Sequence, residues 1–162
     1  MIEVVPFVPE HATGVVSVIL SIQQDEYALP ITLDAQPDLQ DIPGFYQHGN
    51  GNFWVALDDR VVVGTVAVLD IGAGQAALRK MFVAVGHRGP KHGVAQGLLA
   101  TLLAWGRVRG VREIFLGTTA RFPAAHRFYE KNGFREIAHE ELPVRFPIMT
   151  VDTKFYRYAL GT

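Results

Sequence analysis

The alternation of hydrophobic and polar positions predicts which parts of the chain form helices and which form strands. Apolar residues recur every three or four positions from Val15 to Ile22, across 93–109 and across 123–132, which is the spacing of amphipathic helices. Short runs rich in β-branched and aromatic residues separate these segments and predict strands. We expect strands at 2–8, 53–57, 61–69, 76–85, 113–118, 134–140 and 151–160.

Prolines and glycines set the boundaries of these elements. Pro30 and Pro37 make the segment 25–37 irregular, and a short second helix is expected around 38–47. Turn residues are concentrated at 48–52 and 72–74. The predicted order is therefore β-α-α-β-β-β-α-β-α-β-β, which on its own indicates a mixed α/β fold.

Composition narrows the class of protein. The 162 residues suit a single domain, 1–162, with 49% hydrophobic and 19% charged residues. A net charge of −1 gives no reason to expect nucleic acid or a membrane surface as a partner. There is no cysteine, so disulfides, thiolate metal sites and a cysteine nucleophile are excluded. Because no signal-like segment and no apolar run of ~20 residues is evident, we expect a cytoplasmic protein.

The loop between the strand 76–85 and the helix 93–109 has the most specific chemistry. This basic loop contains two glycines and is followed by Gly93, and it matches neither G-x-x-x-x-G-K-[ST] nor G-x-G-x-x-G. Backbone N–H groups, a helix dipole and positive side chains meet there, which predicts an anion site, most simply for phosphate. The candidate groups are the backbone N–H groups from Lys91 to Gln96 and the charges of Arg88 and Lys91.

This loop resembles the acyl-CoA-binding motif of the GNAT superfamily of N-acetyltransferases. The usual pattern there is a strand, then "RG", then Q/R-x-x-G-x-G/A at the start of a helix. Gly93, Val94 and Ala95 match the G-x-G/A end. Pro90 stands at the Q/R position and has no N–H to donate, so the loop departs from the pattern there.

A second motif lies downstream in the order that GNAT domains use. Members commonly carry N-x-x-A-x-x-[apolar]-Y-x-x-x-G-F after the fifth strand, and Phe122 stands here at the Asn position. Two motifs in the right order are more specific than either alone. The matching residues are Ala125, Phe128, Tyr129, Gly133 and Phe134.

The resemblance implies a fold and a reaction. The fold would be a central mixed, mostly antiparallel, twisted sheet of about six to seven strands flanked by about four helices. The reaction would transfer the acetyl group of acetyl-CoA to an amine by direct attack in a ternary complex, with no metal. Tyr129 is the family-matched general acid, because a neutral phenol can protonate the leaving thiolate. The implied cofactor-binding residues are Met81, Phe82, Val83, Arg88, Gly89, Lys91, His92, Gly93, Val94, Ala95, Gln96, Phe122 and His126.

The acceptor and the general base are less well defined by the sequence. Many relatives place a Glu on the fourth strand, but 75–80 contains no carboxylate, which leaves Asp70 and Glu26 as weak candidates. Arg79 and Lys80 could attract an acidic substrate, although alternation along a strand points one away from the other. The segments 25–47 and 142–150 would flank the acceptor, with Phe45, Tyr46 and Phe146 as an apolar wall.

Other functions stay open at this point. The acceptor is a small-molecule amine or a protein amine, and a homodimer is possible. One alternative is a non-catalytic acyl-CoA-binding or sensor domain of the same fold. Another is an α/β domain that binds a different phosphorylated ligand through the same loop. The six histidines are scattered, so no metal site is expected.

Overall fold

The computed structural model describes residues 1–161 and contains one seven-stranded sheet in the order β1-β2-β3-β4-β5-β7-β6. Only β4 and β5 pair in parallel, and the other neighbouring strands are antiparallel. The expected mixed, mostly antiparallel sheet is thus confirmed. The strands are β1 (Ile2–Pro6), β2 (Asn52–Asp58), β3 (Val61–Gly72), β4 (Gln75–Val83), β5 (Glu113–Thr118), β6 (Arg135–Ile137) and β7 (Lys154–Ala159).

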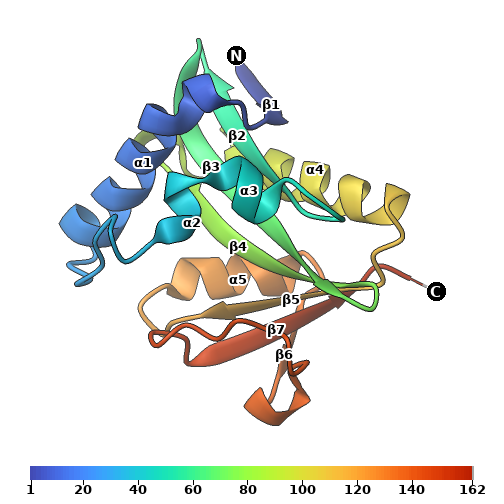
Figure 1. The fold of residues 1–162 in the computed structure, drawn as a ribbon. Coiled ribbons are helices and arrows are strands. Elements are labelled where there is room, and N and C mark those ends of the chain that lie inside the picture. Colours follow the sequence, from blue (N-terminus) through green and yellow to red (C-terminus); the bar gives the residue numbers. More distant parts are fainter. Residues whose placement is uncertain (162) are drawn as a thin grey trace.

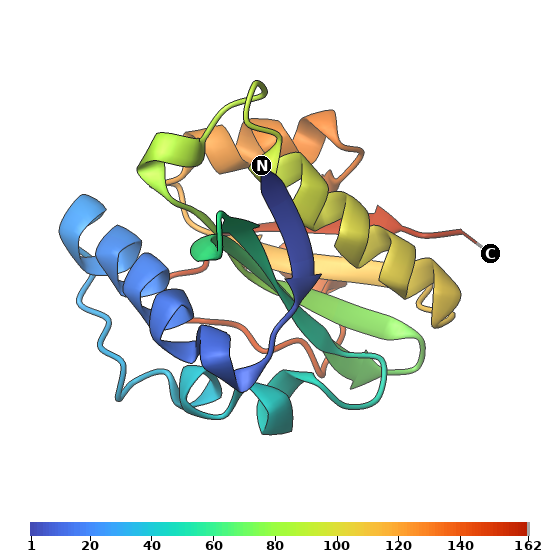
Figure 2. The ribbon, with the colours of Figure 1, turned by 90° about the horizontal axis from the view of Figure 1, so that it is seen from above.

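Helices cover both faces of the sheet (Figures 1 and 2). On one face, α4 (Val94–Val108) and α5 (Pro123–Lys131) pack over a core that includes Leu98, Leu116 and Tyr156. The other face carries α1 (Ala12–Leu20), its π-helical continuation η2 (Ser21–Glu26), and the short helices α2 (Pro37–Gln40) and α3 (Ile42–Tyr46). Three single turns of 3-10 helix complete the list: η1 (Pro9–His11), η3 (Val85–His87) and η4 (His139–Glu141).

Local chemistry explains where the elements differ from the sequence-based boundaries. The expected helix at 38–47 is divided, because Pro43 has no N–H with which to continue a helix, and Asp41 starts α3 by accepting from the Gly44 N–H at 3.1 Å. The strand expected at 134–140 ends at Ile137, where the Glu141 carboxylate takes the Ala138 N–H. Similarly, the Asp152 carboxylate accepts from the Met149 N–H at 2.9 Å and delays the start of β7.

A β-bulge interrupts β4 close to the middle of the sheet. Thr65 of β3 is opposite Phe82, but Ala67 is opposite Arg79, so two residues of β4 face one residue of β3. One of these two residues is Lys80, whose φ is +56°. The Thr65 hydroxyl donates to the Lys80 carbonyl at 2.7 Å. A bulge changes the direction in which side chains point, and this one determines where Arg79 and Lys80 lie.

The sheet opens between β4 and β5. Pairing is limited to Gln75–Ala77 on β4 and Glu113–Phe115 on β5, although β4 continues to Val83 and β5 to Thr118. Beyond these three pairs the two parallel strands separate, and their facing backbone groups have no strand partner. We call this opening the split, formed by 78–83 of β4 and 116–118 of β5.

Candidate functional site

The loop that leads into α4 forms an uncapped helix N-terminus beside the split. Gly93 is the residue before the helix, and its φ of +68° belongs to the left-handed region that glycine adopts without strain. No side chain caps this end, so the N–H groups of the first turn, Val94–Gln96, have no acceptor among the described residues. Such an end binds anions through its N–H groups and its dipole.

The side chains of this loop differ in their exposure to solvent. Lys91 is exposed, whereas His92 is half-buried with its ring 5.9 Å from the ring of His87. Gly89 also has a positive φ, +96°, and a β-carbon added there would meet no atom within 4 Å. On the neighbouring turn of α4, the Gln96 amide donates to Asn132 Oδ1 at 2.9 Å, which ties α4 to the end of α5.

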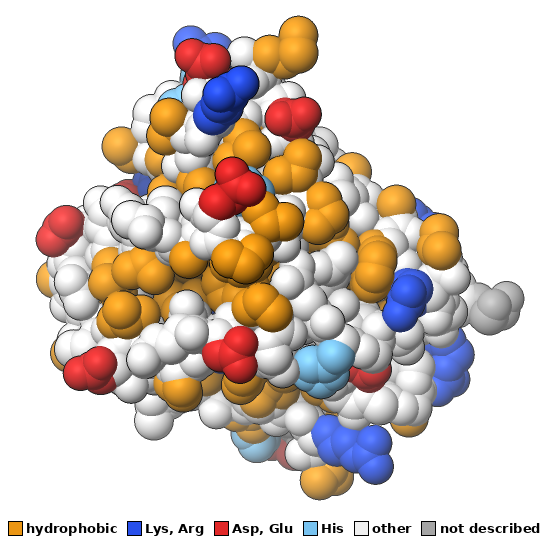
Figure 3. Space-filling model, turned by 45° about the horizontal axis from the view of Figure 1, so that its top comes forward, with side chains coloured by type: hydrophobic (Ala, Val, Ile, Leu, Met, Phe, Trp, Pro, Cys, Tyr) orange, Lys and Arg blue, Asp and Glu red, His pale blue; other side chains and the backbone are white. Residues whose placement is uncertain are grey.

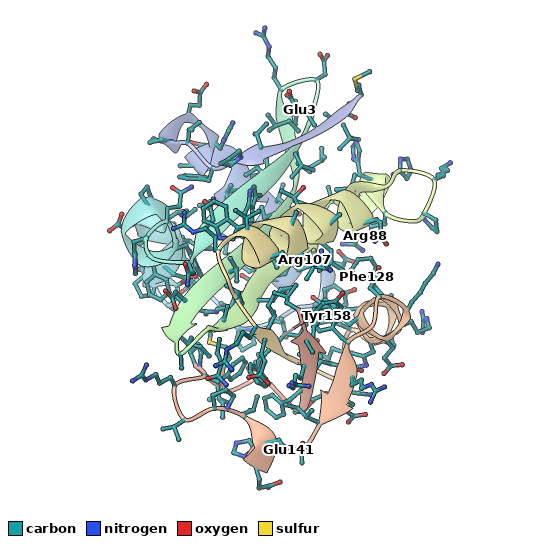
Figure 4. All side chains as sticks on the ribbon, turned by 90° about the vertical axis from the view of Figure 1, so that its right-hand side faces the viewer. Glu3, Arg88, Arg107, Phe128, Glu141 and Tyr158 are labelled. Carbon is teal, nitrogen blue, oxygen red and sulfur yellow. The ribbon has the colours of Figure 1, made fainter. Side chains whose placement is uncertain are left out.

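Arg88 is engaged by the protein itself. Its two terminal nitrogens bind the two carboxylate oxygens of Glu26, each at 2.6 Å, and its Nε donates to the Val83 carbonyl at 2.8 Å. Both side chains are about one-third exposed. The hydrogen bond from Arg88 and its positive charge hold the pKa of the Glu26 carboxyl below its usual value. Figure 4 shows Arg88 at the N-terminal end of α4, between that helix and the α5 residue Phe128.

Tyr129 of α5 is buried in the core beneath α4 and α5. Its ring is 5% exposed and lies 5.4 Å from the ring of Phe134 and 6.1 Å from that of Tyr156. Its hydroxyl has no hydrogen-bond partner among residues 1–161. Every described polar side-chain atom that is fully shielded from solvent does have a partner. The hydroxyl therefore reaches a space open to solvent. Burial raises the pKa of Tyr129 well above its usual value, so the phenol stays protonated.

Two side chains of the split point to the face of the sheet on which Tyr129 lies. Met81 and Val83 of β4 pack against the core that contains Tyr129, whereas Phe82 packs against the core under α1. His126, one turn before Tyr129, is hydrogen-bonded through Nε2 to the Thr119 carbonyl at 2.9 Å.

The loop before α5 contacts the segment that follows α1. The ring of Phe122 meets that of Tyr27 edge-on at 4.6 Å, and Arg121 donates to the Tyr27 carbonyl at 3.2 Å. Glu26, the neighbour of Tyr27, holds Arg88 from the other loop. The end of η2 therefore connects the loops on both sides of the split.

The two carboxylates that the sequence offered as a base are both otherwise engaged. Asp70 accepts from the backbone N–H groups of Asn50 and Gly72, and it lies opposite Ala76, on the closed part of the β4–β5 pair. Glu26 is neutralised by Arg88. A carboxylate whose pKa is lowered is a poor acceptor for the proton of an amine.

Asp152 is a carboxylate that the sequence reasoning did not identify. It lies directly over Gly117 of β5, because a β-carbon added to that glycine would come within 2.5 Å of Asp152 Oδ2. Gly117 is two residues beyond the last β4–β5 pair, on the face that Phe115 shares, opposite the α4–α5 face. Burial raises the pKa of the Asp152 carboxyl. No sequence motif could have shown this position, because it depends on where the loop 142–153 crosses β5.

Arg79 and Lys80 point to the same face of the sheet, contrary to the expectation from strand alternation. Lys80 Nζ donates to Gln36 Oε1 at 2.6 Å and lies 3.5 Å from Asp38. The Arg79 guanidinium lies 5.9 Å from the ring of Tyr46, whose hydroxyl donates to the same Asp38 at 2.6 Å. The bulge at Lys80 is the reason, because the extra residue interrupts the alternation and turns Lys80 to the face on which Arg79 lies.

No group of three or more His, Asp or Glu side chains is placed so that it could hold a metal ion within 1–161. No helix in the same range has the combined length and hydropathy that crossing a bilayer requires.

The fold and the uncapped α4 loop define an acyltransferase type of architecture, and comparison with known proteins identifies the family. The model of the acetyltransferase (GNAT) family matches residues 18–134. A GNAT-family acetyltransferase from Staphylococcus aureus Mu50 has 34% sequence identity and a TM-score of 0.95, covering 99% of this chain and 100% of that one. The chain belongs to the GNAT acetyltransferase family, as the two motifs predicted.

Curated relatives extend the comparison to named enzymes. N-acetyltransferase family 8 member 2 of Rattus norvegicus is 30% identical over 130 residues, which are 77% of this chain and 57% of that protein. Human N-acetylaspartate synthetase is 34% identical over 133 residues, 76% of this chain and 43% of that protein. The chain thus spans about half the length of the curated relatives it matches. The PaiA N-acetyltransferase of Thermoplasma acidophilum, solved in complex with coenzyme A, has the same fold at a TM-score of 0.75 and 15% identity.

Proposed function

We propose that the protein transfers the acetyl group of acetyl-CoA to an amine. The observation that carries the proposal is that Val94, at the start of α4, and Tyr129 of α5 belong to one core on the same face of the sheet. The N–H groups of Val94–Gln96 and the Tyr129 hydroxyl have no partner among the described residues. The first can hold a pyrophosphate and the second can protonate a thiolate. Membership of the GNAT family and the relative solved with coenzyme A support the choice of donor.

The same geometry supports the roles proposed for the remaining residues of the cofactor site. On the side that faces β5, the backbone of Met81, Phe82 and Val83 has no strand partner, although the Val83 carbonyl accepts from Arg88 Nε. The pantetheine arm would lie along this extended edge. The Gly89 and Gly93 conformations keep the loop open at its phosphate side, where Lys91 and His92 supply positive or hydrogen-bonding groups. Phe122 and His126 stand at the other side of the split, next to Thr119 and Tyr27.

In the transfer step the amine nitrogen forms a bond to the thioester carbonyl carbon, and the carbon–sulfur bond breaks. The Tyr129 hydroxyl gives its proton to the departing sulfur, and solvent returns one to the phenol. The attacking amine must lose a proton, and Asp152 is the carboxylate placed to receive it from the opposite face of the sheet. Its raised pKa suits that task, because a base is most effective when its pKa approaches the working pH.

Calorimetric titration of the purified chain with acetyl-CoA, with ATP as the control ligand, tests the proposal. We expect selective binding of acetyl-CoA at micromolar strength, about −8 kcal/mol, followed by release of CoA when an amine panel is added. Binding without CoA release for any amine would indicate an acyl-CoA-binding domain instead. Preference for ATP would indicate that the α4 loop holds a different phosphorylated ligand.

A further inference from the structure

Arg79 occupies an unusual position for an arginine of a central strand. It is half-buried on β4, one residue before the bulge, and its guanidinium lies 5.9 Å from the ring centres of both Phe45 and Tyr46. Its hydrogen bond goes to the thioether of Met149 at 3.4 Å. Among residues 1–161, no carboxylate oxygen lies within 4.0 Å of it, whereas the N-terminus and five other cationic or imidazole side chains each have one that close.

No carboxylate among the described residues pairs directly with Arg79. Asp38 is nearest to the buried Lys80 and also accepts from the Tyr46 hydroxyl. Asp152 is close enough to feel the charge of Arg79, but its Oδ2 accepts the Met149 N–H. The two cations Arg79 and Lys80 therefore lie near the carboxylates of Asp38 and Asp152. Neither carboxylate forms an ion pair with Arg79. A partly desolvated guanidinium without an anion is costly, and a planar two-pronged donor matches a carboxylate.

Met149 separates Arg79 from the candidate base. Its thioether contacts the guanidinium on the β4 side, and its backbone N–H binds Asp152 on the β5 side. A positive and a negative group thus lie on either side of one residue, at the open end of the split. The segments that carry these groups also expose hydrophobic residues: Phe45, Ile148, Met149 and Val151. Figure 3 shows hydrophobic side chains gathered on the face where α1 to α3 lie.

We infer that the acceptor is an amine that also carries a carboxylate, such as a free amino acid, and that Arg79 binds this carboxylate while the amine lies toward Asp152. The inference rests on the proposed acetyl transfer and names the substrate class of that same site. An amino acid complements both charges, whereas a simple amine would leave Arg79 unpaired. The bulge supports this role, because it places Lys80 against Asp38 and so leaves Arg79 as the accessible cation.

The test compares matched acceptors that differ only in the carboxylate. Aspartate, glutamate, methionine and phenylalanine are each assayed beside the corresponding α-carboxamide, with CoA release as the readout. We expect the wild type to favour at least one free acid over its amide by about 10- to 100-fold in kcat/KM. In Arg79→Gln that preference should disappear because the KM for the acid rises to that for the amide, while the KM for acetyl-CoA stays unchanged.

Arg109→Gln is the matched control, because Arg109 also stacks on an aromatic ring, Trp105, at 4.6 Å, but at the far end of α4. It should retain the preference. Equal kcat/KM for acids and amides in the wild type, or an unchanged preference in Arg79→Gln, would overturn the inference while leaving acetyl transfer intact.

A binding experiment separates this inference from the proposed function. Thermal unfolding of the wild type and of Arg79→Gln is measured in the presence of CoA with each acid and each amide. If no CoA is released from acetyl-CoA, a rise in Tm with an acid that is lost in Arg79→Gln still supports the carboxylate site. The absence of any such rise in the wild type overturns it.

Discussion

Glu26 and Arg88 form a two-pronged ion pair with both nitrogen–oxygen distances at 2.6 Å, which joins the end of η2 to the loop before α4. The pair uses the charge that the sequence assigned to the pyrophosphate. Glu26 and a bound phosphate would thus compete for the same guanidinium. Arg88 can serve the cofactor only to the extent that it leaves Glu26.

We expect Glu26→Gln to tighten acetyl-CoA binding about two- to fivefold at low salt, because a partly exposed ion pair is worth about 0.2–1 kcal/mol. Arg88→Gln should weaken binding. Calorimetry at low and high ionic strength measures both variants. If neither changes the affinity, Arg88 only holds the Val83 carbonyl and η2, and it has no role with the phosphate.

Tyr129→Phe should lower kcat by about 10²- to 10⁴-fold while acetyl-CoA affinity stays within about twofold. Burial raises the pKa of the Tyr129 phenol, so the loss of kcat should be independent of pH across the neutral range. Tyr156→Phe is the control, because this neighbouring buried tyrosine already donates to Glu130 at 2.6 Å. A Tyr129→Phe variant with the turnover of the wild type would remove this residue as the acid.

Asp152→Asn should separate activity from stability. We expect kcat/KM to fall about 10²-fold or more, and we expect the wild-type rate to decline toward acid as the carboxylate takes up its proton. Since the folded pKa of Asp152 is raised, its ionised form costs stability above that pKa, and this cost disappears below the unfolded value. The variant should therefore be at least as stable as the wild type at pH 8.

Urea unfolding at pH 8 and at pH 4, beside the pH profile of kcat/KM, checks both parts. The asparagine can still accept the Met149 N–H, so the loop should keep its conformation. A variant that is active but less stable at pH 8 would show that Asp152 is structural and not a base.

Substitution of Gly93 can distinguish backbone strain from charge at the α4 N-terminus. Gly93→Ala should destabilise the fold by about 1 kcal/mol, because φ is +68°, although the added methyl group meets no atom within 4 Å. Gly93→Asp adds a negative charge where phosphate should lie. It should weaken acetyl-CoA binding more than tenfold beyond the alanine variant, and titration of the two proteins side by side measures the difference. Equal affinities would argue against the phosphate assignment.

Much of the fold could be predicted because it depends on local pattern. The helix α4 follows from its apolar rows and from Gly93 and Gly110 at its two ends, and β2 and β3 follow from their apolar runs around Asp59. The two motifs likewise predicted the family, and they propose Tyr129 and the α4 loop as site residues. These features are determined by residues close together in the chain.

The features that were missed depend on contacts between distant segments. The bulge at Lys80 follows from how β4 pairs with β3, and nothing in 75–83 indicates an extra residue there. The position of Asp152 follows from a loop that closes over Gly117, 35 positions earlier in the chain. The engagement of Arg88 by Glu26 joins residues 62 positions apart. Periodicity and motif spacing contain no information about such pairings.

The split also affects how the protein behaves when nothing fills it. Beyond Ala77 and Phe115, two strands present unpaired N–H and carbonyl groups in the interior of a sheet, where most proteins have none. Exposed strand edges are templates for pairing with other chains, and proteins protect them with charges, prolines or covering segments. Here Asp152 lies over Gly117 on one face, and the contact of Tyr27 with Phe122 joins the segments beside the opening. A ligand with its own amide groups along this opening would therefore protect the protein from self-association during storage and concentration.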